Sequence, residues 1–186
     1  MKVLLIGGTG VLSSEIMNLS VKKGYEVYIL NRGRRKHLIP NTVKLMQADI
    51  AKADQIKKLI ENYYFDVVVD FISYTKNQIE NSLSIFKDSC KQFIFISSCA
   101  VYKDNGGKFC TEDSPLINPL WKYSIDKVEC EKLFISLCKK YKIEYTIIRP
   151  AVTYGNTRIP YGIMPLYGYH WTLIARILNN KPVVLW

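Results

Sequence analysis

Three side chains in the second half of the chain, Ser98, Tyr123 and Lys127, are of the types needed for acid–base chemistry on an alcohol. Tyr123 and Lys127 stand four residues apart, a spacing that places two side chains next to each other on one face of a helix. A lysine ammonium beside a phenol favours the phenolate, which can take the proton of an alcohol near neutral pH. Alone, the Tyr-x-x-x-Lys pattern is also explained by an aromatic ring packed on a lysine stem.

The beginning of the chain could bind a phosphate. The apolar run 3–6 leads into Gly7-Gly8-Thr9-Gly10, and helical apolar spacing follows, so the pattern predicts a strand, a tight turn and a helix. Gly7 can adopt the backbone angles of the turn, Gly10 lets the main chain approach a pyrophosphate, and the helix N-terminus offers unpaired N–H groups. A glycine turn required only for steric reasons is the alternative, so this motif by itself leaves both interpretations open.

The elements that must position these residues alternate along the chain. We expect strands at 3–6, 26–30, 43–46, 66–70, 93–96 and 145–148, with helices after the glycine turn and at 51–62, 76–89 and about 119–141. Such alternation predicts an α/β fold, a Rossmann-type doubly wound parallel sheet with strand order 3-2-1-4-5-6, with ligands at the carboxyl ends of the strands. We assign residues 1–150 to a dinucleotide-binding domain and 151–186 to the incomplete start of a substrate-binding lobe.

Two of the expected strand ends carry residues that could select a cofactor. Asn31-Arg32 follows the second strand, where an acidic residue usually binds the ribose of NAD, and an arginine can instead pair with a 2′-phosphate. This favours NADP, with NAD as the alternative, although the basic run 32–36 could simply be a solvated loop. Asp49 follows the third strand and could accept a hydrogen bond from adenine, or cap the next helix.

Composition excludes several classes of protein. The 186 residues are 48% hydrophobic and 23% charged, as in an ordinary globular domain, and no apolar run approaches the roughly 20 residues of a membrane helix, so we expect a cytoplasmic protein. The five cysteines lack the close pairs of a zinc or redox motif, and we assign no metal. The net charge of +10 raises the possibility of nucleic-acid binding, but the lysines are scattered in pairs.

With four motifs in order, the chain resembles the extended short-chain dehydrogenase/reductase superfamily, in its branch of NAD-dependent epimerases and dehydratases that act on nucleotide sugars. The resemblance is carried by the glycine motif 7–13, the serine motif 97–102, the pair in 123–127 and the Arg-Pro…Tyr-Gly signature 149–155. It implies an NAD(P)-dependent epimerase or reductase in which Tyr123 is the acid/base residue, Lys127 holds the nicotinamide ribose and tunes Tyr123, and Ser98 binds the substrate oxygen. The expected cofactor-binding residues are Gly7, Thr9, Gly10, Val11, Leu12, Asn31, Arg32, Asp49, Ile50, Phe71, Ser97, Tyr123, Lys127, Pro150 and Val152.

Departures from the family pattern narrow the chemistry. Sugar 4,6-dehydratases of the family carry an acidic pair after the catalytic hydroxyl residue, whereas this chain has Cys99 and Ala100 there, which disfavours dehydration. Ser13 replaces a glycine or alanine and is small enough to preserve helix packing. Asp126 replaces a serine or threonine with no consequence that the sequence reveals.

The end of the chain departs as well, because family members continue for about another hundred residues. We therefore expect a C-terminally truncated chain that binds the dinucleotide, is itself inactive, and leaves the apolar run 183–186 poorly ordered or self-associating. A nucleotide sugar is the expected substrate and a homodimer is possible. A non-catalytic NAD(P)-binding regulator and an RNA-binding relative of the same fold stay open as alternatives.

Overall fold

The computed structural model describes residues 1–103, 106, 109–116, 121–155 and 170–183. The chain divides into two compact units, Met1–Pro150 and Ala151–Trp186. Within the second unit the structure describes one helix, α5 (His170–Leu178). The expected start of a helix at 119 and most of the apolar run 183–186 lie outside the described residues.

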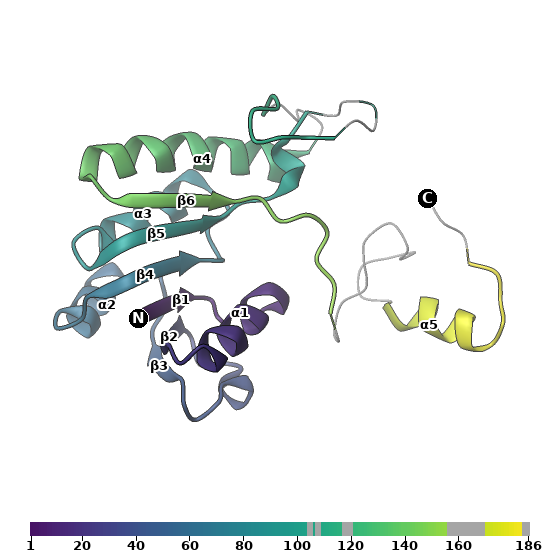
Figure 1. Ribbon diagram of the computed structural model, residues 1–186, viewed down its shortest axis with the longest axis horizontal. Helices are drawn as coiled ribbons and strands as arrows, with labels where there is room; N and C mark the ends of the chain where they lie inside the picture. The colour runs from purple at the N-terminus through teal and green to yellow at the C-terminus, as the bar shows by residue number, and fades with distance from the viewer. Residues whose placement is uncertain (104–105, 107–108, 117–120, 156–169, 184–186) are drawn as a thin grey trace. The chain divides into compact units, whose positions relative to one another are not determined.

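The first unit is built on a six-stranded parallel sheet in the order β3-β2-β1-β4-β5-β6, as expected (Figure 1). The strands are β1 (Lys2–Ile6), β2 (Glu26–Asn31), β3 (Lys44–Gln47), β4 (Phe65–Asp70), β5 (Cys90–Ile96) and β6 (Glu144–Ile148). Because all six strands run the same way, their carboxyl ends, including the expected cofactor positions, meet at one edge of the sheet.

Helices cover both faces of this sheet. They are α1 (Val11–Lys22), α2 (Ala53–Ile60), α3 (Lys76–Phe86) and α4 (Lys122–Tyr141), with short 3₁₀ turns η1 (Lys36–Leu38) and η2 (Cys99–Val101). Alternate residues of β1 point to opposite faces: Leu4 belongs to the core shared with α2, α3 and α4, whereas Leu5 belongs to the core shared with α1. Burial on both faces explains why β1 and β2 are nearly solid apolar runs, whereas the edge strands β3 and β6 are partly exposed.

Element boundaries differ from the sequence expectation by up to three residues, and two of these differences have a visible cause. Helix α2 begins at Ala53 rather than at 51, because Asp49 forms a turn first: its carboxylate accepts from the Ala51 N–H at 3.1 Å and its carbonyl from the Lys52 N–H at 2.9 Å. Strand β5 begins at Cys90 rather than at 93, because Cys90 pairs with Phe65 of β4 even though polar residues follow it.

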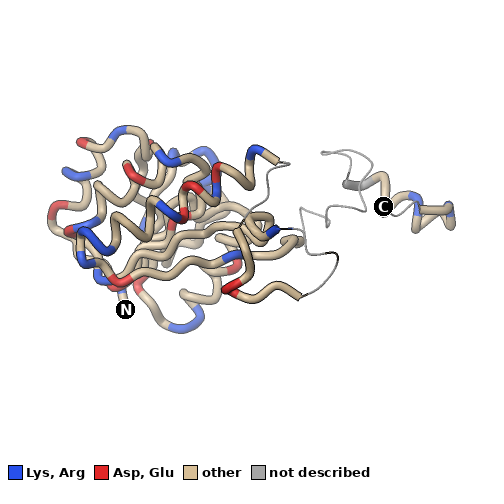
Figure 2. The backbone as a smooth tube through the Cα atoms, turned by 90° about the horizontal axis from the view of Figure 1, so that it is seen from above, with Lys and Arg blue, Asp and Glu red and all other residues tan. Residues whose placement is uncertain are grey.

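Charged residues are spread over the first unit. Figure 2 shows lysines and arginines interspersed with acidic residues along its backbone, rather than gathered on one element. No helix among the described residues is long and apolar enough to cross a membrane. Across the same residues no group of three or more potential metal ligands occurs.

Candidate functional site

A cleft of about 860 Å³ lies at the carboxyl ends of β1, β2, β3 and β4. Seven of the residues singled out from the sequence line it: Gly7, Thr9, Gly10, Asn31, Arg32, Asp49 and Ile50. The other lining residues, which sequence reasoning did not single out, are Leu30, Arg34, Arg35, Ala48, Ala51, Ile72, Ser73, Tyr74, Asn77, Gln78 and Asn81. The cleft lies wholly within the first unit.

Gly7 shapes one wall of the cleft. Its φ is +101°, and a Cβ at this position would lie 2.5 Å from Cγ2 of Ile72, so both the backbone angle and the available space require glycine. The Gly7 N–H donates to the Leu30 carbonyl at 3.0 Å, which fixes the turn against the end of β2. At Gly7 the floor of the cleft is therefore backbone, next to the Ile72 side chain, which also lines the cleft.

Helix α1 begins directly after this turn. The Gly10 N–H donates to Oγ of Ser13 at 2.8 Å, so that amide is engaged within the protein. The N–H groups of Val11 and Leu12 belong to the first helical turn, where no intrahelical acceptor exists, and they coincide with the positive end of the helix dipole. An anion at the N-terminus of α1 would thus be bound by the N–H groups of Val11 and Leu12 rather than by that of Gly10.

The loop after β2 brings more basic side chains to the cleft than the sequence analysis assigned. The Asn31 carboxamide oxygen accepts from the Gly33 N–H at 2.7 Å, and Gly33 has a φ of +76°. This turn leaves Arg32 exposed at the cleft, and Arg34 and Arg35 line it as well. The Arg35 guanidinium reaches the Thr9 carbonyl at 3.4 Å. The basic run itself was the signal, but its spacing could not reveal which members face the cleft.

Helix α3 contributes a polar wall opposite the basic loop. Asn77, Gln78 and Asn81 line the cleft, and the Asn81 amide donates to the Ile50 carbonyl at 2.8 Å. Gln78 also belongs to the capping box that begins α3, and the contact of Asn81 with Ile50 is visible only in the fold.

Lys127 is 1% exposed and anchored by two backbone carbonyls. Its ammonium donates to the carbonyl of Ser73 at 2.7 Å, after β4, and to that of Ile96 at 2.8 Å, at the end of β5. The rings of Tyr74 and Phe95 lie 4.8 and 4.6 Å from its nitrogen. Burial lowers the pKa of Lys127 to about 8, against the opposing effect of nearby acidic groups.

Tyr123 is half-buried between aromatic rings. Its ring centroid lies 4.8 Å from that of Trp121 and 6.2 Å from that of Tyr74. Because Tyr74 also lines the cleft, this aromatic contact connects the cleft with the N-terminal turn of α4.

Ser98 lies at the start of η2, which packs against α4. Its hydroxyl oxygen accepts from the Ala100 N–H at 3.2 Å, and the Cys99 N–H donates to the Pro150 carbonyl at 3.0 Å. Ser97 is buried, and its Oγ has no partner in the described part of the chain. No hydrogen bond joins Ser98, Tyr123 and Lys127 among the described residues, so their joint action stays a prediction.

Two further residues that were expected to bind the cofactor do not line the cleft. Phe71 is partly buried beside the α1 core, and Val152 belongs to the second unit.

Arg149 has a structural role that the sequence did not predict. Its guanidinium binds the buried carboxylate of Glu131 at 3.0 and 2.8 Å and the Tyr102 hydroxyl at 2.8 Å. Hydrogen bonding to Glu131 raises the pKa of Arg149 above its ordinary value. One side chain thereby ties β6 to α4 and to the segment that follows η2.

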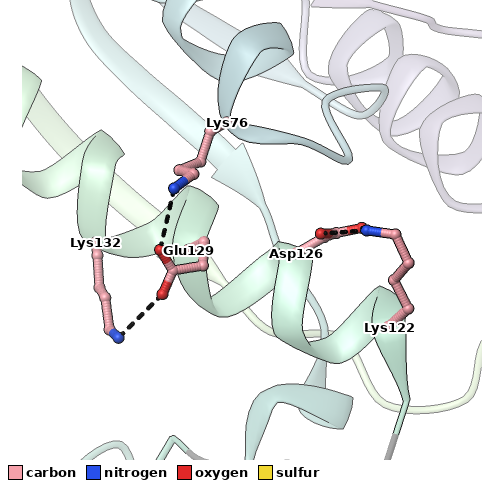
Figure 3. A network of polar contacts seen from close by, with 5 residues as sticks. All are labelled: Lys76, Lys122, Asp126, Glu129 and Lys132. Carbon is pink, nitrogen blue, oxygen red and sulfur yellow. Dashed lines mark hydrogen bonds and ion pairs between the residues drawn. The ribbon is translucent and has the colours of Figure 1, made fainter. Parts of the chain in front are cut away.

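Asp126 faces the surface of α4. Figure 3 shows its carboxylate paired with Lys122 one turn earlier, at 2.7 Å, while Glu129 bridges Lys76 and Lys132. The replacement of a serine or threonine at this position therefore creates an exposed ion pair, which contributes little to stability.

The chain is similar to known proteins in sequence and in fold. A family model described as the NAD dependent epimerase/dehydratase family matches residues 3–186. A UDP-glucose 4-epimerase of Lactobacillus helveticus is 30% identical over 169 residues, which are 80% of this chain and 51% of that protein. The chloroplast stem-loop binding protein of 41 kDa b of Arabidopsis thaliana is 27% identical over 83% of this chain and 42% of its own.

Among solved structures, a UDP-glucuronic acid 4-epimerase of Bacillus cereus in complex with UDP-glucuronic acid and NAD has a TM-score of 0.75. It is 24% identical, and the match covers 98% of this chain and 65% of that one, a likeness that shows the shared fold. The chain spans about half the length of the curated relatives it matches.

Proposed function

The chain belongs to the NAD dependent epimerase/dehydratase family, and from that premise we propose that it binds NAD(P) in the cleft and acts as an epimerase or reductase on a nucleotide sugar. The observation that carries the proposal is the cleft itself: a backbone floor at Gly7, free amides at the start of α1, and Tyr74 linking its wall to Tyr123. The nucleotide-sugar substrate is supported by the names of the relatives.

The residues present fit a dinucleotide. A Cβ at Gly7 would overlap Ile72, another lining residue, the first amides of α1 suit a pyrophosphate, and the buried Asn31 amide nitrogen has no partner among the described residues. We place the adenosine half near Asn31, Arg32, Asp49 and Ile50. When bound, NAD(P) supplies a carbon centre that accepts or returns a hydride.

The chain's own chemistry is proton transfer. Tyr123 takes the proton of the substrate hydroxyl and returns it when the sugar is released. Ser98 donates to the same substrate oxygen, and the Lys127 ammonium, one helical turn after Tyr123 on α4, places a positive charge in this region. Cys99 and Ala100 offer no carboxylate for water elimination, so we propose epimerase or reductase chemistry rather than dehydration.

Turnover of UDP-glucose or UDP-glucuronic acid with and without Tyr123 tests the mechanism. In a version of the protein extended to the full length of its relatives, we expect Tyr123→Phe to lower turnover by at least ~10²-fold and to leave NAD(P) affinity nearly unchanged, because only the proton acceptor is removed. Tyr64→Phe, at an exposed tyrosine before β4, is the matched control and should keep full activity. Near-normal turnover by Tyr123→Phe would place the base elsewhere. A full-length, unmutated version that binds NAD(P) but converts neither sugar would favour the non-catalytic regulator.

The basic loop leads to a proposal on cofactor choice. If Arg32 pairs with a 2′-phosphate, NADP should bind more tightly than NAD by about 1.5–3 kcal/mol, and Arg32→Ala should abolish that preference. Arg34→Ala and Arg35→Ala measure whether these neighbouring arginines, which also line the cleft, contribute to the preference. Arg176→Ala, at an exposed arginine outside the cleft lining, is the control. NAD is the competing cofactor, since the Bacillus cereus structure contains it. Equal or tighter binding of NAD than of NADP by the unmutated chain, measured by calorimetry, overturns the proposed preference for NADP.

RNA binding is the alternative that the same preparation can exclude. Binding through phosphate contacts weakens steeply as salt rises. We expect no RNA binding whose affinity falls steeply with salt concentration, because basic and acidic residues are interspersed over the first unit (Figure 2). A steep salt dependence with micromolar affinity would favour the RNA-binding relative instead. A cytoplasmic location and a homodimer stay predictions.

A further inference from the structure

Asp70, the last residue of β4, is a fully buried carboxylate that the proposed proton transfer does not use. Its Oδ1 accepts from the N–H groups of Ile72 and Ser73 at 2.8 and 3.0 Å, and its Oδ2 accepts from the Ser73 hydroxyl at 2.6 Å. Three donors from the following turn thus converge on one carboxylate, which fixes the backbone of that turn.

The turn after Asp70 directs the Ser73 carbonyl toward Lys127 of α4. The Ser73 carbonyl accepts from the Lys127 ammonium at 2.7 Å, and the Ile96 carbonyl accepts from it at 2.8 Å. Both acceptors are neutral, and no carboxylate bonds Lys127 directly within the described ranges. A buried ammonium held only by neutral groups needs a nearby negative charge to stay protonated.

We infer that Asp70 is the positioning residue of Lys127: it fixes the Ser73 carbonyl that accepts from the ammonium and supplies the negative charge that balances it. The inference rests on the proposed function only for the importance of Lys127, because the contacts themselves are independent of any reaction.

The other groups around Lys127 do not replace Asp70. On α4, burial raises the pKa of the Cys130 thiol to about 11, which keeps it neutral near pH 8. Glu131 is also near, but its carboxylate is engaged by the Arg149 guanidinium. Tyr74 and Phe95 contribute only ring faces. Burial lowers the pKa of Lys127, and the charge of Asp70 is the largest effect that opposes it.

Titration of Lys127 in the full chain tests the inference. Lysines labelled with ¹³C at Cε give one signal each, and Lys127→Met identifies the signal of interest. We expect a midpoint near pH 8 in the unmutated chain. Asp70→Asn keeps the shape and removes the charge, and it should lower this midpoint by about one unit or more. Asp66→Asn is the matched control: it makes the same change at the other end of β4, where Asp66 accepts from the Lys2 N–H, and should leave the midpoint unchanged.

An unchanged midpoint in Asp70→Asn overturns the inference. Should that variant not fold, two measurements decide instead. Asp70→Glu keeps the charge and should hold the midpoint within about half a unit of the unmutated value, since the charge dominates. A midpoint below about 6.5 in the unmutated chain contradicts the inference, because an ammonium balanced by Asp70 would not be lost so easily.

Dinucleotide binding separates this inference from the proposed function. If both hold, Asp70→Asn should weaken NAD(P) binding more at pH 8 than at pH 6, because Lys127 is neutral in the variant only at the higher pH. If the chain binds no dinucleotide at all, the titration still decides the role of Asp70, and only the proposed function fails.

Discussion

Burying the Lys127 ammonium costs folding free energy that depends on pH. Its pKa is lowered to about 8 by burial, whereas an unfolded lysine titrates near 10.4. Below pH 8 both states are protonated and the cost is fully present. Between about pH 8 and 10.4 the unfolded chain retains a proton that the folded chain has released, so the stability contributed by this residue rises with pH.

Comparison with Lys127→Met isolates this effect. The free energy of unfolding of the unmutated chain should increase relative to that of Lys127→Met by about 2 kcal/mol between pH 7 and 9.5. The buried thiols of Cys90 and Cys138, whose pKa values burial raises without an effect of Lys127, destabilise both chains alike above pH 9 and cancel. Urea unfolding at the two pH values measures the difference, and a constant difference would contradict the burial argument.

Residue spacing predicted only part of this environment. The interval from Tyr123 to Lys127 placed both on one helical face, which α4 confirms as a helix over this range. The groups that hold Lys127, however, are backbone carbonyls of Ser73 and Ile96. Every residue carries such a carbonyl, so no sequence pattern distinguishes these two. Only the register of β4 and β5 beside α4 selects them.

At the scale of elements, the turn between β1 and α1 is the part most restricted by geometry. Gly7 and Gly24 both have positive φ, but a Cβ would meet Ile72 at Gly7 and nothing within 4 Å at Gly24. Both Gly→Ala substitutions pay the backbone penalty, and only Gly7→Ala adds steric overlap. We expect Gly7→Ala to be less stable than Gly24→Ala by about 1–3 kcal/mol, the usual cost of overpacking.

The same pair tests the site. Gly7→Ala should also weaken dinucleotide binding, because its methyl group would displace Ile72, which lines the cleft, whereas Gly24→Ala should bind as the unmutated chain does. Denaturant unfolding and calorimetry measure the two effects. Equal stability and equal binding in both variants would show that the turn relaxes.

Element order was predictable and element edges were not, for a physical reason. Apolar runs identified the six strands: they are nearly solid in β1 and β2, where both faces are covered, and more mixed in the partly exposed edge strands β3 and β6. The delayed start of α2 depends on one side-chain hydrogen bond from Asp49, and the early start of β5 depends on pairing with Phe65. Both boundaries depend on hydrogen-bonding or pairing partners, which the residue pattern of the element itself does not reveal.

At the scale of the whole molecule, the proposed cofactor site is confined to one unit. All residues that line the cleft fall between Gly7 and Asn81, and Tyr123 and Lys127 also precede Pro150. The unit Met1–Pro150 contains the complete sheet and both core clusters. A unit with its own core is expected to fold without its neighbour.

Residues 1–150 alone should therefore unfold cooperatively and bind NAD(P) within about threefold of the 186-residue chain, a difference of less than 1 kcal/mol. Denaturant unfolding and calorimetry on the two chains measure this, and turnover of a UDP-sugar in the same samples tests the expectation that the 186-residue chain is inactive. Val152 was expected to contact the cofactor and is absent from the shorter chain. A loss of affinity above tenfold, or about 1.4 kcal/mol, would mean that residues after Pro150 complete the cofactor site and that the cleft alone does not define it.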